Sequence, residues 1–100
     1  MREKAVSKLK IDIFMENYQK ITSDLIKSHM EMMGPNVAMS IAQKISGLKI
    51  TVTGEILDGS KCDKETFEQL RDAYHHFAGS LSEMITKTVL DKHPELRHTI

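Results

Sequence analysis

The chain has 100 residues, 40% of them hydrophobic and 28% charged, which predicts one folded domain over residues 1–100 with flexible ends at about 1–4 and 94–100. Fourteen Lys and Arg residues balance fourteen Asp and Glu residues, so no overall charge draws the chain to nucleic acid or to an anionic membrane surface. A single cysteine, Cys62, excludes an internal disulfide, and with no secretory leader and no long apolar run we expect a cytoplasmic protein without a membrane span.

The first predicted element is a long helix over residues 4–33. Apolar and small side chains recur along it at spacings of three and four, as in the seam of a helix that packs on a partner helix. The seam positions are Ile11, Phe14, Tyr18, Ile21, Leu25, Ser28 and Met32. Gly34 and Pro35 end this helix, because glycine suits a left-handed helix end and proline suits the first turn of a new helix. A shorter helix is predicted over residues 35–46.

A change of period follows the second helix. Leu48, Ile50 and Val52 alternate with polar residues, which is the rhythm of a strand with one buried face. Gly54 supplies a turn, and residues 55–57 can pair back as a second short strand. The sequence therefore predicts a small β-hairpin.

The last predicted element is one helix over residues 64–92, with Asp63 as its N-cap and Pro94 beyond its end. Gly79 interrupts it, yet the heptad rhythm continues across the glycine without a phase slip, which favours a continuous helix. A second seam runs along it at Phe67, Leu70, Tyr74, Phe77, Leu81, Met84 and Thr88.

These elements predict a mainly α fold with the order α-α-ββ-α, and their lengths bear on assembly. A helix of 30 residues is about 45 Å long, whereas a compact domain of this size is roughly 35 Å across. Both long helices would overhang a monomer, so we expect a homodimeric helical bundle with the two seams as its core or interface. The alternative is a monomer in which the second helix and the hairpin cover both seams.

Residues able to carry chemistry are few. His29 and Met33 lie one helical turn apart in a Met-rich segment and could bind a soft metal or haem, although methionine more often fills cores. Asp72 and His76 have the same spacing and are the other candidate metal ligands, although exposed polar residues explain them equally well. Buried at the side of the first seam, His29 could instead meet Tyr18 or Tyr74 from another helix.

No catalytic, phosphate-binding or dinucleotide-binding motif is present, so we expect no cofactor and no enzymatic activity. The leading interpretation is a dimerising protein-interaction module, a signalling or regulatory accessory. Residues 33–42 loosely resemble small helical modules attached to prokaryotic signalling proteins, a likeness that transfers no residue role. The alternatives are a small-ligand or metal sensor that uses residues 29–33, and nucleic-acid binding through the basic arm at residues 2–10. That arm could also attract the acidic stretch 55–72, within or between chains.

Overall fold

The computed structural model describes residues 2–94, with side chains from residue 18 onward. This part of the chain forms four helices, α1 (Arg2–Met33), α2 (Pro35–Ala42), α3 (Lys64–Ala78) and α4 (Ser80–Asp91). The fold is therefore mainly helical, as the sequence predicts. Of the expected flexible ends, residues 1 and 95–100 lie outside the described part.

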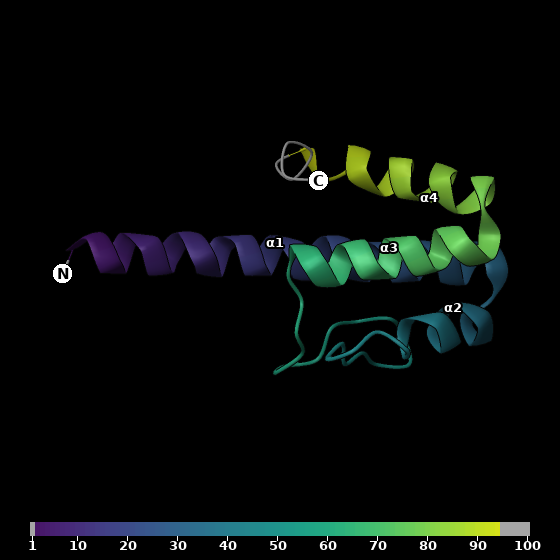
Figure 1. The fold of residues 1–100 in the computed structure, drawn as a ribbon, viewed down its shortest axis with the longest axis horizontal. Coiled ribbons are helices and arrows are strands. Elements are labelled where there is room, and N and C mark those ends of the chain that lie inside the picture. Colours follow the sequence, from purple (N-terminus) through teal and green to yellow (C-terminus); the bar gives the residue numbers. More distant parts are fainter. Residues whose placement is uncertain (1, 95–100) are drawn as a thin grey trace.

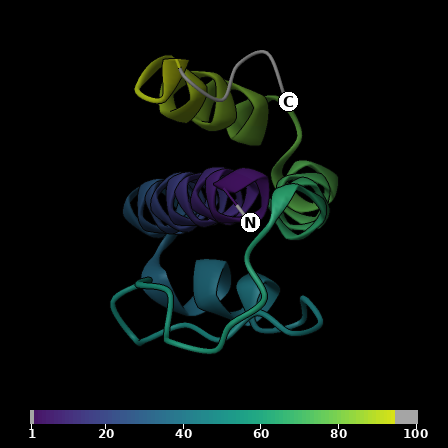
Figure 2. The ribbon, with the colours of Figure 1, turned by 90° about the vertical axis from the view of Figure 1, so that its left-hand side faces the viewer.

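Helix α1 is the centre of the fold. Viewed along its axis in Figure 2, it has α3 beside it, α4 on one side and α2 with the following loop on the other. The core lies where the three shorter helices meet α1, and it contains Tyr18, Ile21, Leu25, Ile26, Ala38, Ala42, Leu48, Phe67, Leu70, Tyr74, Ile85 and Val89. Four helices of one chain thus cover the inner part of both seams, and the predicted dimeric bundle gains no support from this packing.

The prediction of one continuous helix over residues 64–92 is wrong. The chain turns at Gly79, whose φ of 55° and ψ of −126° lie in a region that is essentially restricted to glycine. Its amide N–H still donates to the His75 carbonyl and closes the last turn of α3. The chain then reverses so that α4 packs against α1. Contacts between helices therefore override a heptad rhythm that is unbroken in the sequence.

The predicted β-hairpin is also wrong, because residues 43–63 contain no strand. A single antiparallel bridge joins Ile50 and Ile56, so the chain does turn back, but around a wider loop than the predicted turn at Gly54. The Ser23 hydroxyl donates to the Gly54 carbonyl at 2.9 Å and fixes the loop on α1. A Cβ on Gly54 would lie 3.1 Å from Ile26 Cγ2, and its φ is 87°, so this close approach requires glycine. Backbone hydrogen bonds within the loop, from Thr51 to Glu55 at 2.8 Å and from Leu57 to Lys49 at 2.9 Å, hold this segment together with its contact on α1, although they do not extend into a regular strand pair.

Local signals place the other helix ends well. The Asp63 carboxylate accepts a hydrogen bond from the Thr66 amide at 2.9 Å, which confirms the predicted N-cap of α3. Pro35 begins α2 after Gly34, as predicted. Helix α2 ends at Ala42 rather than Ser46, and turns replace its expected last residues.

Candidate functional site

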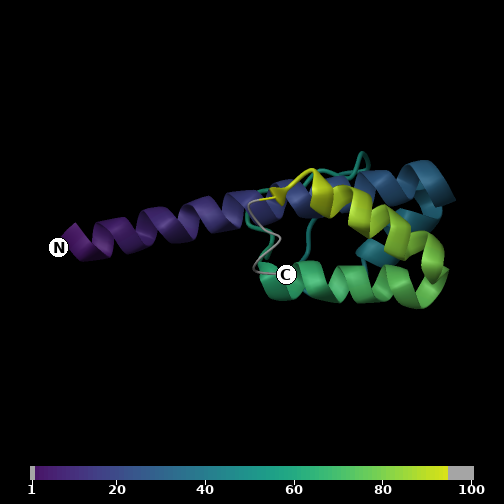
Figure 3. The ribbon, with the colours of Figure 1, turned by 90° about the horizontal axis from the view of Figure 1, so that it is seen from above.

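The first half of α1 extends past the ends of the other helices. Figures 1 and 3 show it projecting from the body of the molecule, and contacts of Phe67 and Cys62 with Tyr18 put the start of α3 beside that residue. At that level the Phe67 and Tyr18 rings lie 6.5 Å apart, and the Cys62 thiol donates to the Tyr18 carbonyl oxygen at 3.4 Å. We call residues 2–17 the α1 overhang. At 1.5 Å per residue it is about 24 Å long, and the described residues place no other helix beside it.

The predicted seam residues separate into buried and exposed groups. Those of α1 and α3 inside the body are buried, namely Tyr18, Ile21, Leu25, Phe67, Leu70 and Tyr74. Leu81 is half-buried, whereas Met32, Phe77 and Met84 are 57%, 62% and 60% exposed. By helical register the buried face of α1 continues into the overhang at Phe14 and Ile11, whose side chains lie outside the described part of the chain.

A shallow apolar groove of about 300 Å³ lies between α1 and α4. Seam residues of both helices line it, including Ser28, Met32, Met84 and Thr88, with the charged side chains of Glu31 and Lys92 also among its lining. The break at Gly79 separates these α4 positions from the seam of α3, so they border the groove beside α1 and do not extend the α3 seam.

A buried polar network joins all four helices. The His29 ring of α1 stacks on the Tyr74 ring of α3, with centroids 3.8 Å apart and planes 9° from parallel. His29 Nδ1 lies 2.8 Å from the Leu25 carbonyl oxygen, and its Nε2 lies 2.8 Å from Ser82 Oγ on α4. The Tyr74 hydroxyl donates to the Ala38 carbonyl of α2 at 2.9 Å. A neutral imidazole that donates from Nδ1 and accepts the Ser82 proton satisfies every one of these bonds.

Burial decides what this network can do chemically. Desolvation lowers the pKa of His29, against a smaller opposing effect of its bond to the Leu25 carbonyl, so the neutral ring is favoured. Burial likewise raises the pKa of Tyr74. A histidine that accepts from a serine hydroxyl has the geometry of a base with its nucleophile. His29 and Ser82 are nevertheless 0% exposed, so no substrate can reach the hydroxyl, and the arrangement stabilises the fold.

The candidate metal ligands lie in two different settings. Both ring nitrogens of His29 already have partners, and Met33 packs half-buried against the core. Asp72 and His76 are exposed on α3, where Asp72 pairs with Arg71 at 3.4 Å. Among residues 18–94 no group of three His, Cys, Asp or Glu side chains is placed to hold a metal ion. The structure therefore brings no further ligand to either pair.

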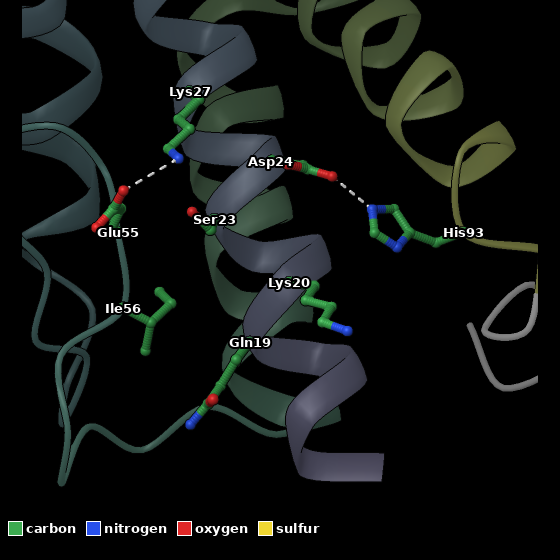
Figure 4. A pocket seen from close by; sticks show the side chains of 8 residues that line it. All are labelled: Gln19, Lys20, Ser23, Asp24, Lys27, Glu55, Ile56 and His93. Carbon is green, nitrogen blue, oxygen red and sulfur yellow. Dashed lines mark hydrogen bonds and ion pairs between the residues drawn. The ribbon is translucent and has the colours of Figure 1, made fainter. Parts of the chain in front are cut away.

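A polar groove of about 580 Å³ runs over the solvent side of α1. Figure 4 shows its side chains, with Glu55 and Ile56 of the loop on one side of α1 and His93 on the other. Lys27 pairs with Glu55 at 3.6 Å, and His93 Nε2 lies 2.5 Å from Asp24 Oδ2. These pairs link the loop and the segment that follows α4 to α1. The groove therefore carries both positive and negative charges, and Asp24, Lys27, Glu55 and His93 are paired.

Sequence reasoning missed Ser82 and the Asp24–His93 pair. Ser82 lies 53 residues from His29, and His93 lies 69 residues from Asp24, so no local spacing connects them. A weak signal does exist on α1, where Lys20, Asp24 and Lys27 follow one another at helical spacing. This spacing predicts a polar face on α1 but does not identify the residues that pair with it.

No helix within the described residues is long and apolar enough to cross a membrane. Comparison with known proteins finds no protein-family model, no curated protein and no solved structure that matches the chain.

Proposed function

We propose that the protein is a helical association module that forms homodimers through the α1 overhang and serves as a signalling or regulatory accessory. One observation carries the proposal. The face of α1 that α3 covers in the body continues into the overhang, where the described residues place no helix. In that stretch the sequence keeps apolar residues at seam spacing, Ile11 and Phe14.

A helical segment without a packing partner has little stability of its own in water. Helices shorter than about 12–15 residues are marginal in water, and most helical stability in proteins comes from packing an apolar face. A projecting helix of this length, with a phenylalanine and an isoleucine on one face, is stabilised by a second helix. Each such side chain contributes about 1.5–3 kcal/mol when it is fully buried. A second copy of the chain offers an identical face, and twofold dimers are the commonest soluble oligomers.

Paired variants test the proposal. We expect wild-type chain at micromolar concentration to sediment as a dimer, and the double variant Ile11→Asn with Phe14→Asn to be monomeric. The control replaces Asp12 by Asn and Glu16 by Gln, two positions that lie on the opposite face by helical register, and should remain dimeric. Equal masses for the two variants would reject the overhang as the interface.

Two alternatives have less support. A metal or small-ligand sensor at residues 29–33 would require His29 to leave the Leu25 carbonyl or Ser82. It predicts metal or visible absorption in the purified protein, together with a melting temperature that copper, zinc or haem raises. Nucleic-acid binding through the basic arm predicts retention on DNA or RNA that falls steeply with salt. We expect neither, and we expect no turnover of hydrolase or transferase substrates.

A further inference from the structure

We propose that the two α1 overhangs of the homodimer run antiparallel. The basic tip of each overhang, residues 2–10, then lies against the acidic start of α3, residues 63–68, in the partner. The inference rests on the proposed dimer and adds its geometry. In this arrangement the partner's overhang occupies, alongside residues 4–15, the position that α3 occupies alongside the second half of α1. The two bodies then lie at opposite ends of the paired helices.

The positions of the bodies disfavour the parallel alternative. Helix α3 begins level with Tyr18 and lies on the same face of α1 that Phe14 and Ile11 extend. In a parallel pair joined through that face, both copies of α3 would begin at the same level and compete for the same space. An antiparallel pair avoids this collision, because beside each overhang the partner contributes only its own overhang.

The charges of the overhang also favour the antiparallel orientation. Four cations, Arg2, Lys4, Lys8 and Lys10, stand against one acidic residue in its first ten positions. By heptad register Lys8 and Lys10 flank the apolar stripe, as the charges that set helix orientation in coiled coils do, and Lys4, seven residues before Ile11, falls on the continuation of the stripe. A parallel pair would place these cations beside their own copies, which costs free energy through like-charge repulsion.

The antiparallel pair instead places the tip near the first turns of the partner's α3. Acidic side chains are concentrated there, with Asp63 capping the helix and Glu65 and Glu68 exposed or half-exposed on it. Their present cationic neighbours form only surface ion pairs, Lys61 with Glu65 at 3.7 Å and Lys64 with Glu68 at 3.9 Å. Such pairs contribute little and rearrange readily. The acidic groups also offset the unfavourable position of Arg2 and Lys4 at a helix N-terminus.

Charge reversal separates the two orientations. The tip-reversed variant carries Lys4→Glu and Lys8→Glu, and the α3-reversed variant carries Glu65→Lys and Glu68→Lys. We expect each alone to weaken homodimerisation about tenfold or more at low salt, because two contacts of two charges are reversed in every dimer. An equimolar mixture of the two should form heterodimers about as tightly as wild type dimerises. The difference in affinity between the variant homodimers and the mixed heterodimer should shrink at about 1 M salt, where charge screening is nearly complete.

Each other outcome overturns a specific statement. If wild type is monomeric, the proposed function fails. If wild type is dimeric but the tip-reversed variant prefers wild-type chains to the α3-reversed variant, the overhangs are parallel and only the orientation fails. Unchanged affinities for all variants also reject the orientation. Cysteine cross-linking provides a readout that does not depend on charge. A mixture of Lys4→Cys and Met15→Cys chains should link to each other, because Met15 borders the apolar stripe at the level of the partner's tip, whereas Lys4→Cys chains linking mainly among themselves would show a parallel pair.

Discussion

Replacing Ser82 by Ala tests whether the buried polar network holds α4 on α1. The Ser82 hydroxyl lies 2.8 Å from His29 Nε2, and both side chains are 0% exposed. The substitution leaves the ring nitrogen without this partner where water cannot replace it, which costs about 1–3 kcal/mol. Since a domain of this size is stable by about 5–15 kcal/mol in total, the loss is a large fraction of its stability. The melting temperature should fall by about 4–8 °C for each kcal/mol lost.

Ser80→Ala is the matched control, because Ser80 is an exposed serine in the first turn of the same helix. Both substitutions change helix propensity in the same direction, so the difference between them isolates the buried hydrogen bond. Urea denaturation followed by circular dichroism measures both, and the m-value should stay constant. If Ser82→Ala and Ser80→Ala differ by less than about 0.5 kcal/mol, the usual scatter for surface substitutions, the bond to His29 does not hold α4 in place.

Three further predictions follow from described contacts. The pKa of His29 is lowered in the folded state, so its contribution to stability should be present in full above its ordinary value of 6.5 and decline as pH falls below it. Urea midpoints between pH 5 and 8 should show this decline in wild type and in a His76→Gln control, but less of it in His29→Gln. Gly54→Ala should lower stability by more than about 1 kcal/mol, because its φ and the nearby Ile26 side chain both oppose a Cβ; an unchanged melting temperature would contradict the loop packing. Cys62 should react slowly with a thiol reagent in the native state, because burial raises the pKa of its thiol, and it should react fast in urea; rapid native labelling would contradict its burial.

Elements with strong local signals were predictable from the sequence. The Gly34 and Pro35 pair ends α1 and begins α2, and Asp63 caps α3, because these effects act within a few residues of the chain. The prediction of a continuous last helix was wrong. The spacing of apolar residues is unchanged across Gly79 and so gives no sign of a break, whereas the packing of α4 on α1 favours a reversal there. A pattern along one helix cannot report which helix it will meet.

The predicted hairpin failed for a related reason. Alternation suggested a shared buried face, yet Leu48 is buried whereas Val52 is 84% exposed. The segment combines a few local backbone bonds, such as Thr51 N–H to the Glu55 carbonyl, with a bond from a distant group, the Ser23 hydroxyl donating to the Gly54 carbonyl across 31 residues. For the candidate site, the sequence placed His29 beside the seam with Tyr74 as one possible neighbour, which the stacked rings realise. It could not identify Ser82, because only the reversal at Gly79 brings that residue to the imidazole.

The mass of the whole chain in solution tests the central claim most directly. Multi-angle light scattering across a concentration series around the micromolar range should give twice the mass of one chain, falling toward the single-chain mass only on dilution. That result is expected because the α1 overhang carries an apolar face that α3 covers elsewhere along the same helix. A single-chain mass that does not change with concentration would contradict association through the overhang.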